Sequence, residues 1–158
     1  MKSITPFKSL LPVLLAALGL AACASTGMRD AEKLEMYRDH AGEPVPDFRF
    51  FGQINGWTPL GDSAVAVWTR PREAWLLELH GPCPDLPFAH AISLTSNMNR
   101  VHARFDKVVA LGGSSIEIPC TIREIRPLDV GAIREAERQN REEGAGERAQ
   151  PGPAPSGT

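Results

Sequence analysis

The sequence predicts a mainly β (α+β) domain, in which a small antiparallel curled sheet or barrel of about five to seven strands is flanked by an N-terminal and a C-terminal helix. Two observations predict this class. Apolar and polar residues alternate in short segments between residues 45 and 126, whereas a helical period appears on either side of that region. Prolines and glycines separate the alternating segments, as is typical of turns between antiparallel strands.

The first helix is predicted over residues 28–41. Ala31, Leu34 and Tyr37 recur at three-residue spacing and would form its apolar stripe, and Gly42 would end it.

The second helix is predicted to begin at Leu128-Asp129. Asp129 is a favourable N-cap residue, and Leu128 can pack against Ile133 in the first turn. Glu137 and Arg141 are four residues apart, so we expect them to pair on the helix surface.

The clearest hairpin joins a strand over residues 63–69 to a strand over residues 74–80 through a turn at 70–73. Alternation places one apolar set on a shared face and leaves Glu78 and His80 on the other. The apolar set is Val65, Val67, Trp75, Leu77 and Leu79.

Other segments are shorter or less regular. Phe48 and Phe50 alternate with charged residues, and Asn55-Gly56 indicates a turn.

Three prolines make residues 81–87 irregular, and residues 88–104 carry no clear pattern. Strands are predicted over 106–111 and 116–126. In the second of these strands one face would hold Ile116, Ile118, Cys120 and Ile122.

The N-terminus has the features of an export signal. Lys2 and Lys8 give a positive leading region, and an apolar run follows over residues 10–22, which is shorter than the roughly 20 residues that span a bilayer. The run ends in Leu20-Ala21-Ala22-Cys23, which resembles the lipobox of bacterial prolipoproteins. The resemblance implies that Cys23 carries lipid, with more than the two acyl chains that stable anchoring needs.

The expected location is the cell envelope of a Gram-negative bacterium. Ala24 follows Cys23 in place of an acidic residue, which favours the periplasmic face of the outer membrane. The predicted segments are a removed leader (1–22), a lipid-anchored tether (23–27), a single globular domain (28–143) and a disordered Gly/Ala/Pro-rich tail (144–158).

Composition sets the size and charge of the mature chain. Removing 22 of 158 residues leaves 136, enough for one domain with a modest core. The leader takes two of the 17 basic residues, so 15 remain against 19 acidic ones, a formal charge of −4. We therefore expect no nucleic acid partner.

Two cysteines remain after Cys23 is assigned to the lipid. Cys83 and Cys120 form an even pair in an oxidising compartment, which predicts a disulfide. The alternative is a periplasmic metal-handling protein that binds zinc or copper through His80, Cys83, His90 and Cys120. The two hypotheses exclude each other, because a disulfide sulfur is not a thiolate ligand.

No catalytic motif appears. The sequence has no Gly-x-Ser-x-Gly elbow, calcium loop or phosphate-binding glycine loop. We therefore expect a non-enzymatic protein without a cofactor, and an envelope enzyme with an unrecognised site is the weaker alternative.

Two stretches supply candidate surface contacts. Trp68 has the opposite parity to the valines of its strand, so it would be exposed beside Arg70 and Arg72. The second stretch would place three cations on one strand face as an anion-binding stripe, unless that face is simply solvated. These cations are Arg100, His102 and Arg104.

Several motifs resemble a family of short lipoproteins of Gram-negative bacteria whose domain has no assigned function. The motifs lie within 56–62, 66–71, 74–79, 81–86 and 122–129. The resemblance implies the same layout and includes both inner cysteines, but it implies no substrate, cofactor or catalytic residue. The leading hypothesis is therefore a lipid-anchored envelope protein that binds a ligand or an envelope protein through its surface.

Overall fold

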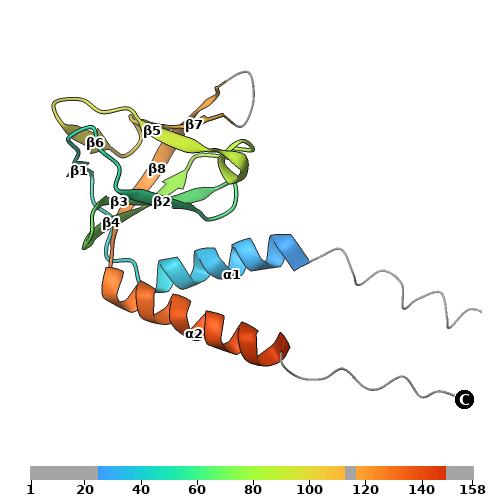
Figure 1. The fold of residues 1–158 in the computed structure, drawn as a ribbon. Coiled ribbons are helices and arrows are strands. Elements are labelled where there is room, and N and C mark those ends of the chain that lie inside the picture. The colour runs from blue at the N-terminus through green and yellow to red at the C-terminus, as the bar shows by residue number, and fades with distance from the viewer. Residues whose placement is uncertain (1–24, 113–116, 149–158) are drawn as a thin grey trace, which may run out of the picture.

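The computed structural model describes residues 25–112 and 117–148 (Figure 1). Cys23, the predicted leader and residues 149–158 of the predicted tail lie outside these ranges. Neither helix in the described ranges combines the length and the apolar character needed to cross a membrane.

The described chain forms two antiparallel sheets and two long helices. A six-stranded sheet of order β2-β3-β4-β8-β7-β5 curls until it is nearly closed, and β1 pairs with β6 in a separate two-stranded sheet (Figure 1). The predicted mainly β class with a helix at each end is confirmed. The strands are β1 (Asp47–Arg49), β2 (Gly56–Pro59), β3 (Ala64–Arg70), β4 (Glu73–Leu79), β5 (Ala91–Leu94), β6 (Arg100–His102), β7 (Lys107–Leu111) and β8 (Pro119–Leu128). The helices are α1 (Ser25–Asp39), α2 (Val130–Arg148) and the short 3-10 helix η2 (Leu86–Phe88).

The β3–β4 hairpin matches its prediction to within one residue at each end. Val65 lies opposite Leu77 and Val67 lies opposite Trp75, so these side chains share one face as expected. They belong to the inner core, which the curled sheet encloses together with residues such as Phe48 and Phe50. Burial removes these apolar side chains from water, which is the main favourable term in folding.

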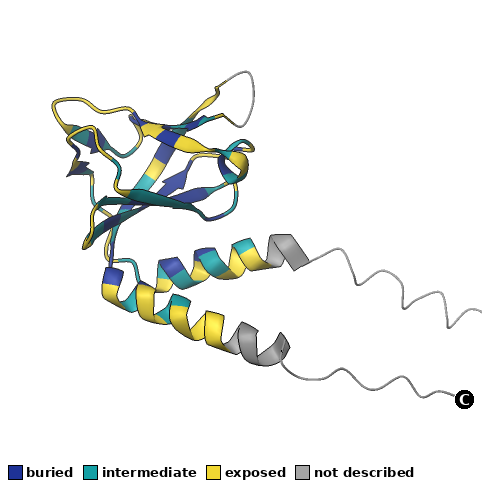
Figure 2. Cartoon of the chain, viewed as in Figure 1, coloured by how far each residue is buried: buried dark blue, intermediate teal, exposed yellow. Residues whose placement is uncertain are grey.

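The other face of the hairpin is buried too. Ala64, Ala66 and Leu76 point into an outer core, where Tyr37 of α1 and Ile133 of α2 cover the sheet. Figure 2 shows that burial concentrates in the sheet and in the parts of the helices nearest to it. Because both faces of β3 and β4 are covered, both strands are almost continuously apolar.

Helix α1 starts earlier than predicted. It begins at Ser25, three residues before the predicted start at Met28. Leu34 and Tyr37 are buried as the apolar stripe predicts, whereas Ala31 is exposed.

Helix α2 begins as predicted. The Ala132 N–H donates to Asp129 Oδ1 at 3.0 Å, which is the expected N-cap bond, and Leu128 and Ile133 both lie in the outer core. The helix continues to Arg148, beyond the predicted domain end at residue 143.

The predicted ion pair between Glu137 and Arg141 is wrong. Arg141 Nε donates to the backbone oxygen of Glu137 at 3.2 Å instead. The Glu137 carboxylate accepts a hydrogen bond of 2.7 Å from the Tyr37 hydroxyl, so it joins α2 to α1.

A β-bulge in β8 changes which of its side chains face inward, compared with the predicted alternation. Glu78 lies opposite Glu124 and Leu79 lies opposite Ile122, so Arg123 is the extra residue. The bulge turns both Ile122 and Ile125 toward the inner core, although strict alternation would separate them.

Three other local predictions need correction. Gly56 begins β2 and does not form a turn, because it pairs with Trp68. The unassigned segment 88–104 contains β5 and β6. Ile118 precedes β8 and is 57% exposed, so it does not share a buried face with Ile122, and Ile116 lies outside the described residues.

Candidate functional site

The two inner cysteines form the predicted disulfide. Cys83 and Cys120 are bonded, with their Cα atoms 6.0 Å apart, and the bond ties the loop before η2 to the start of β8. The metal site made of both cysteines with His80 and His90 is not formed, because neither sulfur is free to act as a thiolate. Within residues 25–112 and 117–148, no three His, Cys, Asp or Glu side chains converge in a way that would hold a metal ion.

The predicted exposure of Trp68 is wrong. Its parity is as expected, but the face it lies on is the outer core, where its ring meets Tyr37 edge-on with centroids 6.4 Å apart. A helix packed on the sheet therefore half-buries the indole. Arg70 is exposed but pairs with Glu73 at 3.0 Å, and Arg72 lies exposed in the adjoining turn.

The predicted stripe of three cations is also not formed. Arg100 Nε donates to Asp47 Oδ1 at 2.6 Å across the β1–β6 pair. His102 donates its backbone N–H to Asp106 Oδ2 at 2.7 Å, and its Nδ1 lies 3.3 Å from the same oxygen. Arg104 follows β6 in a turn with a φ of 69°, so it does not continue the strand face.

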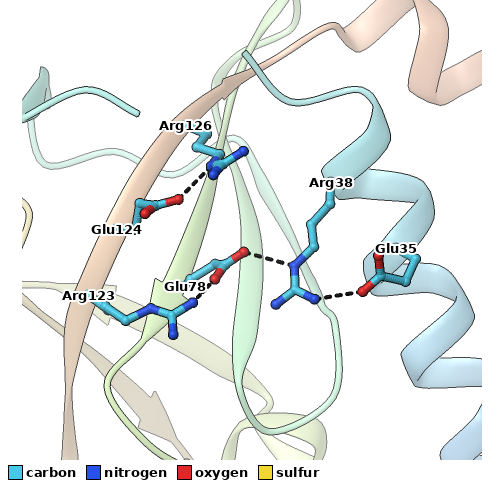
Figure 3. A network of polar contacts seen from close by, with 6 residues as sticks. All are labelled: Glu35, Arg38, Glu78, Arg123, Glu124 and Arg126. Atoms are coloured by element: carbon cyan, nitrogen blue, oxygen red, sulfur yellow. Dashed lines mark hydrogen bonds and ion pairs between the residues drawn. The ribbon is translucent and has the colours of Figure 1, made fainter. Parts of the chain in front are cut away.

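A polar cluster joins α1 to the sheet (Figure 3). The buried carboxylate of Glu78 accepts a 2.9 Å bond from Arg38 Nε of α1 and also pairs with Arg123 of β8. Burial alone would raise the pKa of Glu78, but the hydrogen bonds and charges of the two arginines outweigh it and lower that pKa. Glu35 pairs with the same Arg38, so every charge of this group is balanced and its role is structural.

The surface at the outer end of the β1–β6 pair was not predicted from the sequence. A cleft of about 240 Å³ lies at the outer end of the β1–β6 pair. We define the β1–β6 tip by the residues that line it, which are Arg49, Phe51, Met98, Asn99 and Arg100. In Figure 1, β1 and β6 lie at the opposite end of the molecule from the first residues of α1 and the last residues of α2.

The β1–β6 tip exposes two large apolar side chains. Met98 is 90% exposed and Phe51 is 62% exposed. Arg49 is exposed beside them, and its side chain forms no hydrogen bond or ion pair with the described part of the chain. Aromatic residues, methionine and arginine are the types enriched where proteins meet partners, so this surface is the best candidate contact.

The turn at the β1–β6 tip has an uncommon backbone. Asn97 and Arg100 exchange both of their backbone hydrogen bonds, at 2.9 and 3.0 Å, and enclose Met98 and Asn99. The φ angles of 50° and 58° at these two residues are those of a type I′ turn. Asn suits this left-handed region, but Met is rarely found there. Asn97 and Asn99 were the available sequence signals, and the Met between them obscured the turn.

A family model described as a family of unknown function (DUF6491) matches residues 6–144. No curated protein and no solved structure matches the chain.

Proposed function

We propose that this chain, which belongs to the family of unknown function DUF6491, is a lipid-anchored protein of the Gram-negative cell envelope that contacts a partner through the β1–β6 tip. The lipid is on Cys23, and the protein resides on the periplasmic face of the outer membrane. Its role is interaction, and it catalyses no reaction.

The cysteine pattern supports the anchor. Cys83 and Cys120 are joined to each other, which leaves Cys23 as the third cysteine, directly after the apolar run of the leader. A disulfide is typical of a protein folded outside the cytoplasm, where a lipobox-like signal would deliver it.

Met98 carries the proposal for the contact surface. The fold holds this apolar side chain in a left-handed turn and exposes nearly all of it to water. Both features cost free energy, and an unfavourable local conformation of this kind is typical of functional sites. The adjoining Arg49, whose side chain is exposed and has no partner in the described part of the chain, favours a partner protein with an apolar pocket bordered by an acidic side chain.

The anchor is tested by the intact mass of the mature protein from membranes, with and without reduction. We expect a chain beginning at Cys23 with added acyl mass, and a gain of two hydrogens on reduction. A mature chain without acyl mass would contradict the anchor.

The contact surface is tested by photo-crosslinking in native envelopes. Phe51 is replaced by p-benzoylphenylalanine, and Phe88, a similarly exposed phenylalanine outside the β1–β6 tip, is replaced in the control. We expect one discrete protein adduct from position 51 that is absent from position 88 and is lost when Met98→Asn is added. An adduct that survives Met98→Asn, or that forms equally from position 88, would contradict the proposal.

A further inference from the structure

A second concave surface lies at the other end of the molecule. A groove of about 760 Å³ runs between the middle of α1, the end of β2 with the turn that joins it to β3, and the segment around η2. We call it the α1 groove. Two carboxylates, Asp30 and Asp62, line it. Its apolar lining is Ala31, Leu34, Pro59, Leu60, Pro84, Pro87 and Phe88.

A short segment keeps Phe88, the largest exposed apolar side chain of the groove, in contact with solvent. Phe88 is 72% exposed, whereas Leu86 two residues earlier is fully buried in the inner core. The Phe88 N–H donates to the Asp85 backbone oxygen at 3.1 Å, and the disulfide at Cys83 fixes the start of the segment. Leu86 thus points into the inner core, while the Phe88 ring lies on the groove.

The α1 groove lies close to Cys23 along the chain. Helix α1 begins at Ser25, two residues after Cys23, and Asp30 at the groove is five residues further on. Two residues of extended chain and five of helix span at most about 15 Å. In Figure 1, η2 and the β2–β3 turn lie on the side of the sheet toward which the N-terminal half of α1 extends.

We propose that the α1 groove holds one acyl chain of the lipid on Cys23. This inference rests on the proposed anchor. Two chains suffice for stable attachment to a bilayer, so one further chain can leave it without loss of the anchor. Transfer from the bilayer to the groove moves that acyl chain from one apolar surrounding to another. It also removes the exposed lining of the groove from water, which is favourable.

The shape and charge of the surface favour a single chain over the bilayer itself. A concave groove fits a narrow hydrocarbon chain, whereas a bilayer presents a broad surface. Asp30 and Asp62 at the groove would also be pressed against anionic headgroups if this face lay flat on the membrane.

The test uses the full lipidated protein in vesicles of phosphatidylethanolamine and phosphatidylglycerol. Phe88 is replaced by p-benzoylphenylalanine, which is also aromatic, and the protein is irradiated, digested and analysed by mass spectrometry. We expect an intramolecular adduct that joins the residue 88 peptide to the acylated Cys23 peptide. The same replacement at Phe51, which lies outside the groove, should give at least tenfold less of this adduct.

A substitution in the α1 groove tests whether the adduct depends on the groove. Ala31→Glu places a charge in the α1 groove at an exposed helix position and should abolish the adduct, whereas Ala91→Glu, at an exposed position of β5, should leave it unchanged. Adducts of residue 88 with vesicle phospholipid only, or no lipid adduct on a fully acylated chain, would overturn the groove proposal and leave the anchor intact. A chain without acyl mass would overturn both.

Discussion

At the scale of single residues, Met98 is where backbone preference and observed conformation disagree most clearly. A left-handed conformation costs an L-residue roughly 1–2 kcal/mol, and asparagine tolerates it better than methionine does. Because Met98 is almost fully exposed, its side chain recovers little of this free energy through packing within its own domain.

Replacing Met98 should therefore affect the stability of the folded domain differently from its contact with a partner. Met98→Asn is expected to raise the free energy of unfolding by about 0.5–1 kcal/mol, because Asn adopts the same φ at lower cost. Met98→Val, which is β-branched, should lower it by a similar amount. Urea unfolding followed by circular dichroism measures both. A destabilised Met98→Asn variant would show that the methionine packs against the chain and is not held out for a partner.

Glu78 is one of two charged residues that are buried in the described part of the chain. Its carboxylate is buried between Arg38 and Arg123, and its pKa is below the ordinary value of 4.5. A carboxylate with a lowered folded-state pKa stabilises the protein above its unfolded-state pKa. That stabilisation is lost as the pH falls through the lowered value.

Glu78→Gln should accordingly cost about 1–3 kcal/mol at neutral pH, because it leaves charged partners incompletely paired. The difference from the native protein should shrink as the pH falls below 4.5. Glu35→Gln is the matched control, since Glu35 pairs with the same Arg38 on the surface and should change stability little. Unfolding free energies measured from pH 7 to 3 test this, and a difference that grows on acidification would refute it.

At the scale of elements, the loop before η2 and the strand β8 depend on each other. Three prolines keep residues 81–87 out of the strand ladder, although the Cys83 N–H donates to the Asp62 backbone oxygen at 2.7 Å. The Cys83–Cys120 disulfide joins this loop to β8 across 37 residues and limits the freedom of the unfolded chain.

Removing the disulfide with Cys83→Ser and Cys120→Ser should lower the free energy of unfolding by about 3–4 kcal/mol, according to the loop-closure entropy. Adding a reductant to the native protein should reproduce that loss and should not affect the double variant. If neither treatment shifts the urea midpoint, the bond would have no role in holding this loop.

At the scale of the whole molecule, the sheet separates two cores. The inner core lies inside the curled sheet, and the outer core lies between the sheet and the helices. The two helices contact each other through the bonds from Tyr37 to Glu137 and from Asn140 to Met36, and α1 is attached to the sheet by the outer core and by the ion pair of Arg38 with Glu78.

Weakening the outer core should therefore release α1 before the sheet opens. Leu34→Ala is expected to cost about 2 kcal/mol and to speed amide hydrogen exchange in α1 tenfold or more. Central amides of β4 and β8 should remain the slowest to exchange. Equal acceleration in α1 and in both strands would mean that the helix and the sheet unfold together.

The sequence by itself determined the features that depend on near neighbours. Alternation placed the β3–β4 hairpin, the N-cap at Asp129 located the start of α2, and the even pair of cysteines indicated the disulfide. Each of these follows from a short stretch of residues or from a count, so no knowledge of distant packing was needed.

The tertiary structure alone decided the features that depend on distant segments. Trp68 is half-buried because helices cover its face, and Arg100 is paired because β1 lies beside β6. The bulge at Arg123 changes which side chains of β8 face inward. The exposed β1–β6 tip and the α1 groove likewise arise where segments far apart in the sequence meet, and local periodicity carries no information about such meetings.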